Sequence, residues 1–117
     1  MKWAFKTPRV NKRDGESLVV YVIEAGPYVK VGIAADIRTR LTVFQTHCPL
    51  QCRVAYSSEK MLRPKAREVE IACHEHLILN HVHGEWFEAS AERAILFLKT
   101  LLGVDSKKEP TQLRLIA

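Results

Sequence analysis

Cysteine is scarce in this sequence, and the three cysteines in 117 residues are an odd number. Small secreted proteins usually depend on a full set of disulfides, which an odd count does not supply. No apolar run reaches the length of a membrane span, and residues 1–15 lack the apolar segment of a secretory signal. We therefore expect a protein of the cytoplasm, with no disulfide framework and no membrane partner.

Repeats and low-complexity segments are also missing, and acidic residues are outnumbered. Asp and Glu total 13 against 18 Lys and Arg, which gives a net charge of +5 and a pI near 9.3. The basic residues gather in two groups, one before Asp14 and one in residues 60–67. Such groups suit the phosphates of a nucleic acid, although a solvated surface or an acidic partner protein would also account for them.

The length of the chain and the order of its apolar patterns predict one α+β domain. We divide the chain into a basic N-terminal arm (1–16), a domain (17–103) and a C-terminal tail (104–117). The expected elements are strands at 17–25 and 28–34, a helix at 37–47, a strand at 52–58, and helices at 61–80 and 91–102. Because the first two strands form a hairpin, the expected fold is a small three-stranded antiparallel sheet flanked by helices.

Local signals mark the ends of these elements. Gly26 and Pro27 separate the first two strands, Asp36 and Ser90 are good helix N-caps, and Gly103 is a good helix end. The boundaries of the hairpin and of two helices therefore follow from single residues.

The segment "HVHGEWFEAS", residues 81–90, is expected to form a turn and a short extended piece. Trp86 and Phe87 are expected to close the sheet against the last helix, and Glu85 is expected to be a surface acid. No chemistry is assigned to this segment from its composition.

One carboxylate falls on a helix face that the pattern otherwise marks as buried. Ala66, Val69, Cys73 and Leu77 recur at helical spacing, and Glu70 points into the same stripe. Either Glu70 lies at the rim and reaches water, or the stripe borders a functional site. A carboxylate at such a border suits a hard divalent cation such as Mg²⁺.

A zinc site is a competing interpretation of the polar residues. Cys48, Cys52 and Cys73, with several histidines between residues 74 and 83, are chemically suitable ligands. The spacing of Cys48 and Cys52 is wider than a C-x-x-C knuckle, and Cys73 points into the apolar stripe, where a thiol usually acts as a small hydrophobe. We therefore favour ordinary cysteines over structural zinc.

Five landmarks in this order resemble the GIY-YIG nuclease superfamily, in the short branch whose second signature reads KIG. They are "VVY" ending in Tyr21, "KVG" at Lys30–Gly32, Arg40 in "RTRL", Glu70 with His74 one turn later, and "GEWFE" at Gly84–Glu88. The resemblance covers residues 18–100. The family's late asparagine has no assigned match, although Asn80 lies near its place.

The resemblance implies a role for each of five side chains. Glu70 would hold Mg²⁺ or Mn²⁺, Arg40 would stabilise the charge of the transition state, and Tyr21 would deprotonate or position the attacking water. Lys30 would tune Tyr21 or bind phosphate, and His74 would orient the carboxylate or contact phosphate. Without the resemblance, Tyr21 is expected to be a core aromatic and Lys30 a solvated strand lysine. Arg40 is expected to be partly desolvated, or paired with Glu70 in a buried salt bridge.

These expectations combine into a divalent-metal-dependent endonuclease that hydrolyses phosphodiester bonds in DNA. A catalytically inactive nucleic-acid-binding module of the same fold is the alternative, and a small interaction protein that binds an acidic partner is a third. The sequence does not separate DNA from RNA, and a homodimer would suit a nuclease that cuts both strands.

Overall fold

The computed structural model describes residues 15–103, so residues 1–14 of the predicted arm and the predicted tail at 104–117 lie outside the described residues. The elements are β1 (Ser17–Ala25), β2 (Tyr28–Ala34), α1 (Ile37–Thr46), β3 (Cys52–Ser57), β4 (Met61–Leu62), α2 (Arg63–His76), the 3₁₀ turn η2 (Ile78–Asn80), β5 (His81–His83), β6 (Trp86–Phe87) and α3 (Ala91–Leu102). The predicted α+β class, with an antiparallel sheet and helices around it, is confirmed.

The sheet has more strands than the sequence predicted. Its order is β3-β1-β2-β6-β5, and β4 pairs with the start of β1, which makes six strands rather than three. The additional strands, β4, β5 and β6, are two or three residues long. Segments this short carry no periodic pattern, so only their long-range pairing defines them as strands.

The helix ends follow their capping residues. Asp36 Oδ1 accepts a hydrogen bond of 3.1 Å from the backbone N–H of Arg38, and Ser90 Oγ accepts one of 3.1 Å from that of Arg93. Gly103 ends α3 with a φ of 74°, in the left-handed region that glycine tolerates best. The helix predicted at residues 61–80 is shorter, because residues 61–62 join the sheet as β4 and η2 follows α2.

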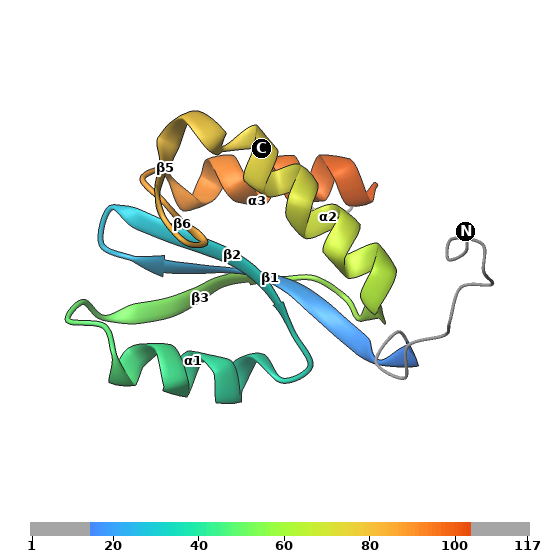
Figure 1. The fold of residues 1–117 in the computed structure, drawn as a ribbon, viewed down its shortest axis with the longest axis horizontal. Helices are drawn as coiled ribbons and strands as arrows, with labels where there is room; N and C mark the ends of the chain where they lie inside the picture. Colours follow the sequence, from blue (N-terminus) through green and yellow to red (C-terminus); the bar gives the residue numbers. More distant parts are fainter. Residues whose placement is uncertain (1–14, 104–117) are drawn as a thin grey trace, which may run out of the picture.

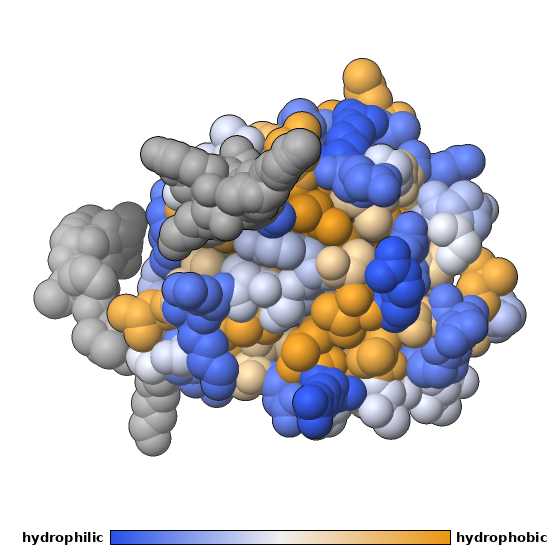
Figure 2. Space-filling view, turned by 180° about the vertical axis from the view of Figure 1, so that it is seen from behind, coloured by the Kyte–Doolittle hydropathy of each residue, from blue (hydrophilic) through white to orange (hydrophobic). Residues whose placement is uncertain are grey.

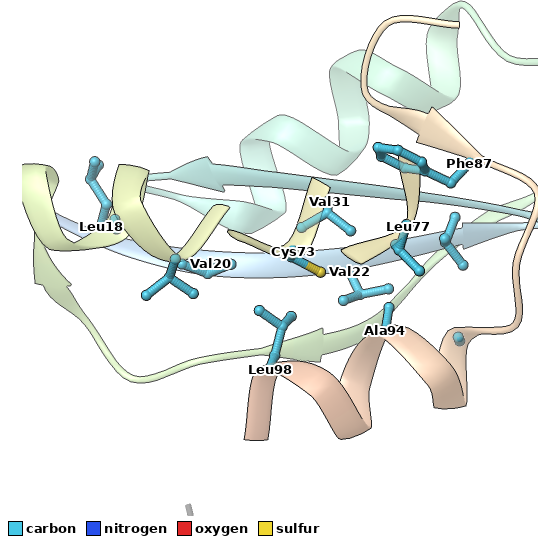
Figure 3. Packing of buried hydrophobic residues seen from close by; sticks show 13 residues of the cluster. Leu18, Val20, Val22, Val31, Cys73, Leu77, Phe87, Ala94 and Leu98 are labelled. Atoms are coloured by element: carbon cyan, nitrogen blue, oxygen red, sulfur yellow. The ribbon is translucent and has the colours of Figure 1, made fainter. Parts of the chain in front are cut away.

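Helices cover both faces of the sheet (Figure 1): α2 and α3 lie on one face and α1 lies on the other. Figure 3 shows the larger core, where Val20, Val22 and Val31 of the sheet meet Cys73 of α2 and Leu98 of α3. Because strand β1 is covered on both faces, its residues 18–23 form a continuous buried run without polar alternation.

The smaller core lies between the sheet and α1, and this face carries the polar residues discussed below. Tyr21 and Ile23 of β1 pack there against Leu41 and Phe44 of α1. Trp86 also lies on this face, whereas Phe87 lies in the larger core. Adjacent strand residues point to opposite faces, so Phe87 packs as expected and Trp86 does not.

Some apolar side chains remain on the surface, including Leu79 in η2 (95 % exposed) and Leu96 in α3 (68 % exposed). Figure 2 shows one face of the molecule, on which hydrophobic and hydrophilic groups are interleaved. None of the helices within residues 15–103 has the length and apolar character needed to cross a membrane.

Candidate active site

The candidate site lies at the edge of the sheet where β6 stops. Strand β6 pairs with β2 only at Val29 and Lys30. At the next residue, the Val31 N–H donates to the Glu85 carbonyl over 3.3 Å, and His74 Nε2 bonds the Val31 carbonyl over 2.8 Å. Helix α2 and the β5–β6 turn are thereby held against this edge, and their side chains reach the α1 face of the sheet.

A cavity of about 280 Å³ opens at this edge. Its charged and polar lining comes from β1, α1, α2 and the β5–β6 turn, and includes Tyr21, Arg40, Arg63, Arg67, Glu70 and Glu85. Three of the five predicted site residues, Tyr21, Arg40 and Glu70, therefore meet around one space. Lys30 and His74 are not part of its lining.

Glu70 is buried rather than placed at a solvated rim, with 5 % of its surface exposed. Its carboxyl group is in hydrogen-bonding contact with that of Glu85. Burial, followed by the charge of Glu85 and this hydrogen bond, raises the pKa of Glu70 to about 7. Burial also pushes the pKa of Glu85 upward, but the hydrogen bond and charge of Lys30 outweigh it and lower that pKa. Glu85 therefore carries the negative charge, and Glu70 holds the proton more readily.

Lys30 is enclosed instead of solvated, and its side chain is 11 % exposed. Its ammonium lies 2.9 Å from Glu85 Oε1, 4.7 Å from the ring centre of Phe44 and 5.8 Å from that of Trp86. The rings and the carboxylate fix the ammonium in one position. Lys30 does not line the cavity, and it acts on the site through its ion pair with Glu85.

Tyr21 lies under α1 with 1 % of its surface exposed. Burial raises the pKa of its phenol, the charge of Glu85 adds to the rise, and the charge of Arg40 opposes it. Lys30 is not among the charges that act on this phenol. Tyr21 is therefore a neutral hydroxyl at neutral pH.

Gly32 leaves the space that Tyr21 and Glu85 use. It pairs with Tyr21 across β1 and β2. A Cβ at Gly32 would stand 2.7 Å from Tyr21 Cζ and 3.2 Å from Glu85 Oε1. The phenol ring and the carboxylate thus close over the bare backbone of this glycine.

Arg40 is exposed, so the expected partial desolvation is wrong. Helix α1 has no fully buried residue, and its outer side chains remain in water. The buried salt bridge between Arg40 and Glu70 is also absent from residues 15–103. Arg67 of α2 is likewise exposed and makes no ion pair there, whereas Arg63 bonds Glu16 over 2.6 Å. Two guanidinium groups, from α1 and α2, therefore line the cavity without forming an ion pair within residues 15–103, although the charge of Arg67 acts on Glu70.

His74 and Asn80 face other parts of the fold. His74 bonds the β2 backbone and lies 5.2 Å from the Phe87 ring centre, which ties α2 to the sheet. Asn80 Oδ1 accepts a hydrogen bond of 2.8 Å from Arg93 of α3. The place of Asn80 therefore gives no reason to add it to the site.

Glu85 is the site residue that the sequence analysis missed. Its backbone lies in the two-residue turn between two very short strands, and only the docking of that turn on β2 brings it to Glu70. The motif "GEWFE" was the one available signal. Composition and periodicity alone mark Glu85 as an ordinary turn acid.

The oxygen atoms around the cavity suit a hard cation. Glu70, Glu85 and the Tyr21 hydroxyl are oxygen donors, and Mg²⁺ usually binds one or two carboxylates and completes its shell with water. Within residues 15–103, no group of three or more His, Cys, Asp or Glu side chains is arranged to hold a metal ion, as a structural zinc would require. Cys73 lies in the larger core instead.

A comparison with protein families gives a match, and it covers nearly all of the described domain. Neither the curated proteins nor the solved structures include a match to the chain. The family model of the T5orf172 domain matches residues 18–102, which include every strand and helix except the first residue of β1. The chain belongs to the T5orf172 domain family, a family of phage-type nuclease-like domains.

Proposed function

We propose that the protein is a divalent-metal-dependent endonuclease of the GIY-YIG type that hydrolyses phosphodiester bonds in DNA. The observation that carries the proposal is the meeting of Tyr21, Arg40 and Glu70, from three separate elements, around one cavity. Membership of a nuclease-like domain family supports the same conclusion.

Glu70, with its partner Glu85, would hold Mg²⁺ or Mn²⁺. When bound, the cation supplies Lewis-acid stabilisation of the phosphoryl group and of the leaving oxygen. The helix α2 fixes the Glu70 carboxylate against the sheet edge, and the cavity leaves room for water and a phosphate beside it.

Arg40 and Tyr21 act on the substrate directly. The Arg40 guanidinium is exposed and without an ion pair in residues 15–103, so it is available to bind two phosphoryl oxygens and stabilise their charge as water attacks. The Tyr21 hydroxyl is neutral and orients the attacking water by hydrogen bonding. The water oxygen would form the new bond to phosphorus and release its proton to solvent water, while the bond to the leaving ester oxygen breaks and that oxygen takes a proton from water.

Lys30 and His74 act through other residues in this proposal. Lys30 keeps Glu85 ionised and directed toward Glu70. His74 fixes α2 on β2 through the Val31 carbonyl. Both roles are narrower than the direct contacts with phosphate that the resemblance allowed.

The Arg40→Ala variant should nick supercoiled plasmid in Mg²⁺ roughly 100-fold more slowly than the wild type, because the transition state loses its guanidinium. Arg38→Ala is the matched control, since Arg38 lies on the same helix, is exposed, and does not line the cavity. EDTA should stop the wild type. Equal rates for the two variants would exclude Arg40 from the site, and cleavage in EDTA would exclude the metal.

A nucleic-acid-binding module without cleavage remains the second candidate, and one observation favours it. The phenol of Tyr21 has a raised pKa and is a poor base, whereas Arg40 and Arg67 are sufficient to bind phosphate. This candidate predicts salt-sensitive binding of DNA or RNA, with no strand cleavage in any divalent cation.

A further inference from the structure

Glu85 is held at the cavity by its backbone as well as by its side chain. Gly84, with a φ of 57°, permits the two-residue turn between β5 and β6. The Glu85 carbonyl then accepts a hydrogen bond from the Val31 N–H. The carboxylate that follows from this turn is therefore fixed relative to β2, as a metal ligand needs to be.

Two carboxyl groups at the cavity share one bonded cation within residues 15–103. Lys30 is the cation that bonds Glu85, and Glu70 adds a second carboxyl group in contact with the first. Glu70 makes no ion pair of its own within residues 15–103. The two carboxyl groups therefore share one directly bonded ammonium in a largely buried place, and Arg67 acts on Glu70 only from a distance, without an ion pair.

An independent feature also indicates a missing oxygen-binding partner. Tyr21 is 1 % exposed and lines the cavity, yet its hydroxyl has no hydrogen-bond partner among residues 15–103. Buried hydroxyl groups are normally satisfied by protein, water or a bound ion. The Tyr21 ring tip and Glu85 Oε1 close over the same Gly32, so the hydroxyl and the carboxylate share one side of the cavity.

We propose that Glu85 would be the second carboxylate ligand of the divalent cation, together with Glu70, and that Lys30 is the positioning residue that aims it. This inference rests on the proposed metal-dependent function and extends it to the geometry of the metal site. The Tyr21 hydroxyl, which shares one side of the cavity with Glu85, would bond a water molecule beside this site.

The test is Mn²⁺ binding, measured by the loss of the free-ion electron paramagnetic resonance signal. Glu85→Gln keeps a hydrogen-bond acceptor for Lys30 but removes the charge, so it should weaken Mn²⁺ binding about tenfold or more. Glu88→Gln is the matched control, because Glu88 is exposed, lies in the same segment and does not line the cavity. Wild-type affinity in Glu85→Gln, or equal losses in both variants, would overturn the proposal.

A second measurement needs no substitution of a ligand. The Trp86 ring lies 5.8 Å from the Lys30 ammonium, so Tb³⁺ at the two carboxylates should show emission sensitised by Trp86 that falls severalfold in Trp86→Phe. Unchanged emission would place the cation elsewhere and overturn the proposal. Failure of the nuclease function is distinguishable, because it would leave plasmid uncut while Mn²⁺ binding still depended on Glu85.

Discussion

Replacing Glu70 with glutamine should reduce DNA cleavage roughly 100-fold or more, because the variant loses the central charged ligand of the cation. The same variant should make the metal-free protein more stable at alkaline pH. The substitution lowers the cleavage rate but raises the free energy of unfolding, because the ionised carboxylate binds the cation and is unfavourable when buried without it. Glu68→Gln is the control, since Glu68 is exposed on the same helix and does not line the cavity.

The sign of the stability effect follows from the pKa of Glu70, which the fold raises from 4.5 to about 7. Between these values the folded protein keeps a proton that the unfolded chain releases, so the free energy of unfolding falls as pH rises toward 7. Above pH 7 the ionised carboxylate stays buried and the loss is complete. The glutamine variant has no such loss.

We expect the stability gap between Glu70→Gln and the wild type to widen by about 3 kcal/mol from pH 4.5 to pH 8. Urea unfolding in EDTA at both pH values measures it. A gap that stays constant with pH, or one that also appears in Glu68→Gln, would mean that the Glu70 carboxylate is solvated. Glu70 would then not be the buried carboxylate on which the proposed metal site depends.

The second large effect is expected from Gly32→Ala. The added Cβ would lie 2.7 Å from Tyr21 Cζ, closer than any unstrained contact, and the ring is fixed under α1. Overpacking of this kind costs about 2 kcal/mol of unfolding free energy. Cleavage should also fall at least about tenfold, because Tyr21 and Glu85 are pushed apart.

Gly15→Ala provides the control for this substitution. A Cβ at Gly15 meets nothing within 4 Å. Thermal unfolding and plasmid nicking of the two variants separate local crowding from the general cost of removing a glycine. Wild-type stability and activity in Gly32→Ala would show that the phenol and the carboxylate do not share the space above this glycine.

The elements that the sequence predicted well are those defined by local signals. Asp36 and Ser90 cap the starts of α1 and α3 with their own side chains, and Gly103 ends α3 through its backbone conformation. These helix boundaries can therefore be predicted from the sequence without knowledge of tertiary contacts. The hairpin of β1 and β2 is equally local, because Gly26 turns directly between two β-branched runs.

The features that the sequence did not predict depend on contacts between distant segments. Glu85 becomes a site residue only when the β5–β6 turn docks on β2, and the enclosure of Lys30 needs Phe44 and Trp86 from two other elements. Arg40 was expected to be partly desolvated, but a helical wheel does not show how loosely α1 covers the sheet. The position of Glu70 was predictable, because its helix face was clear, whereas its partner was not.

The most direct test of the central claim is nicking of supercoiled plasmid across the gel-filtration peak of the purified protein, in Mg²⁺ and in EDTA. The account predicts that wild-type nicking follows the protein peak and stops in EDTA, and that Glu70→Gln purified in parallel is inactive. Cleavage that does not follow the peak, or that persists equally in Glu70→Gln, would contradict the assignment of this cavity as a metal-dependent nuclease site.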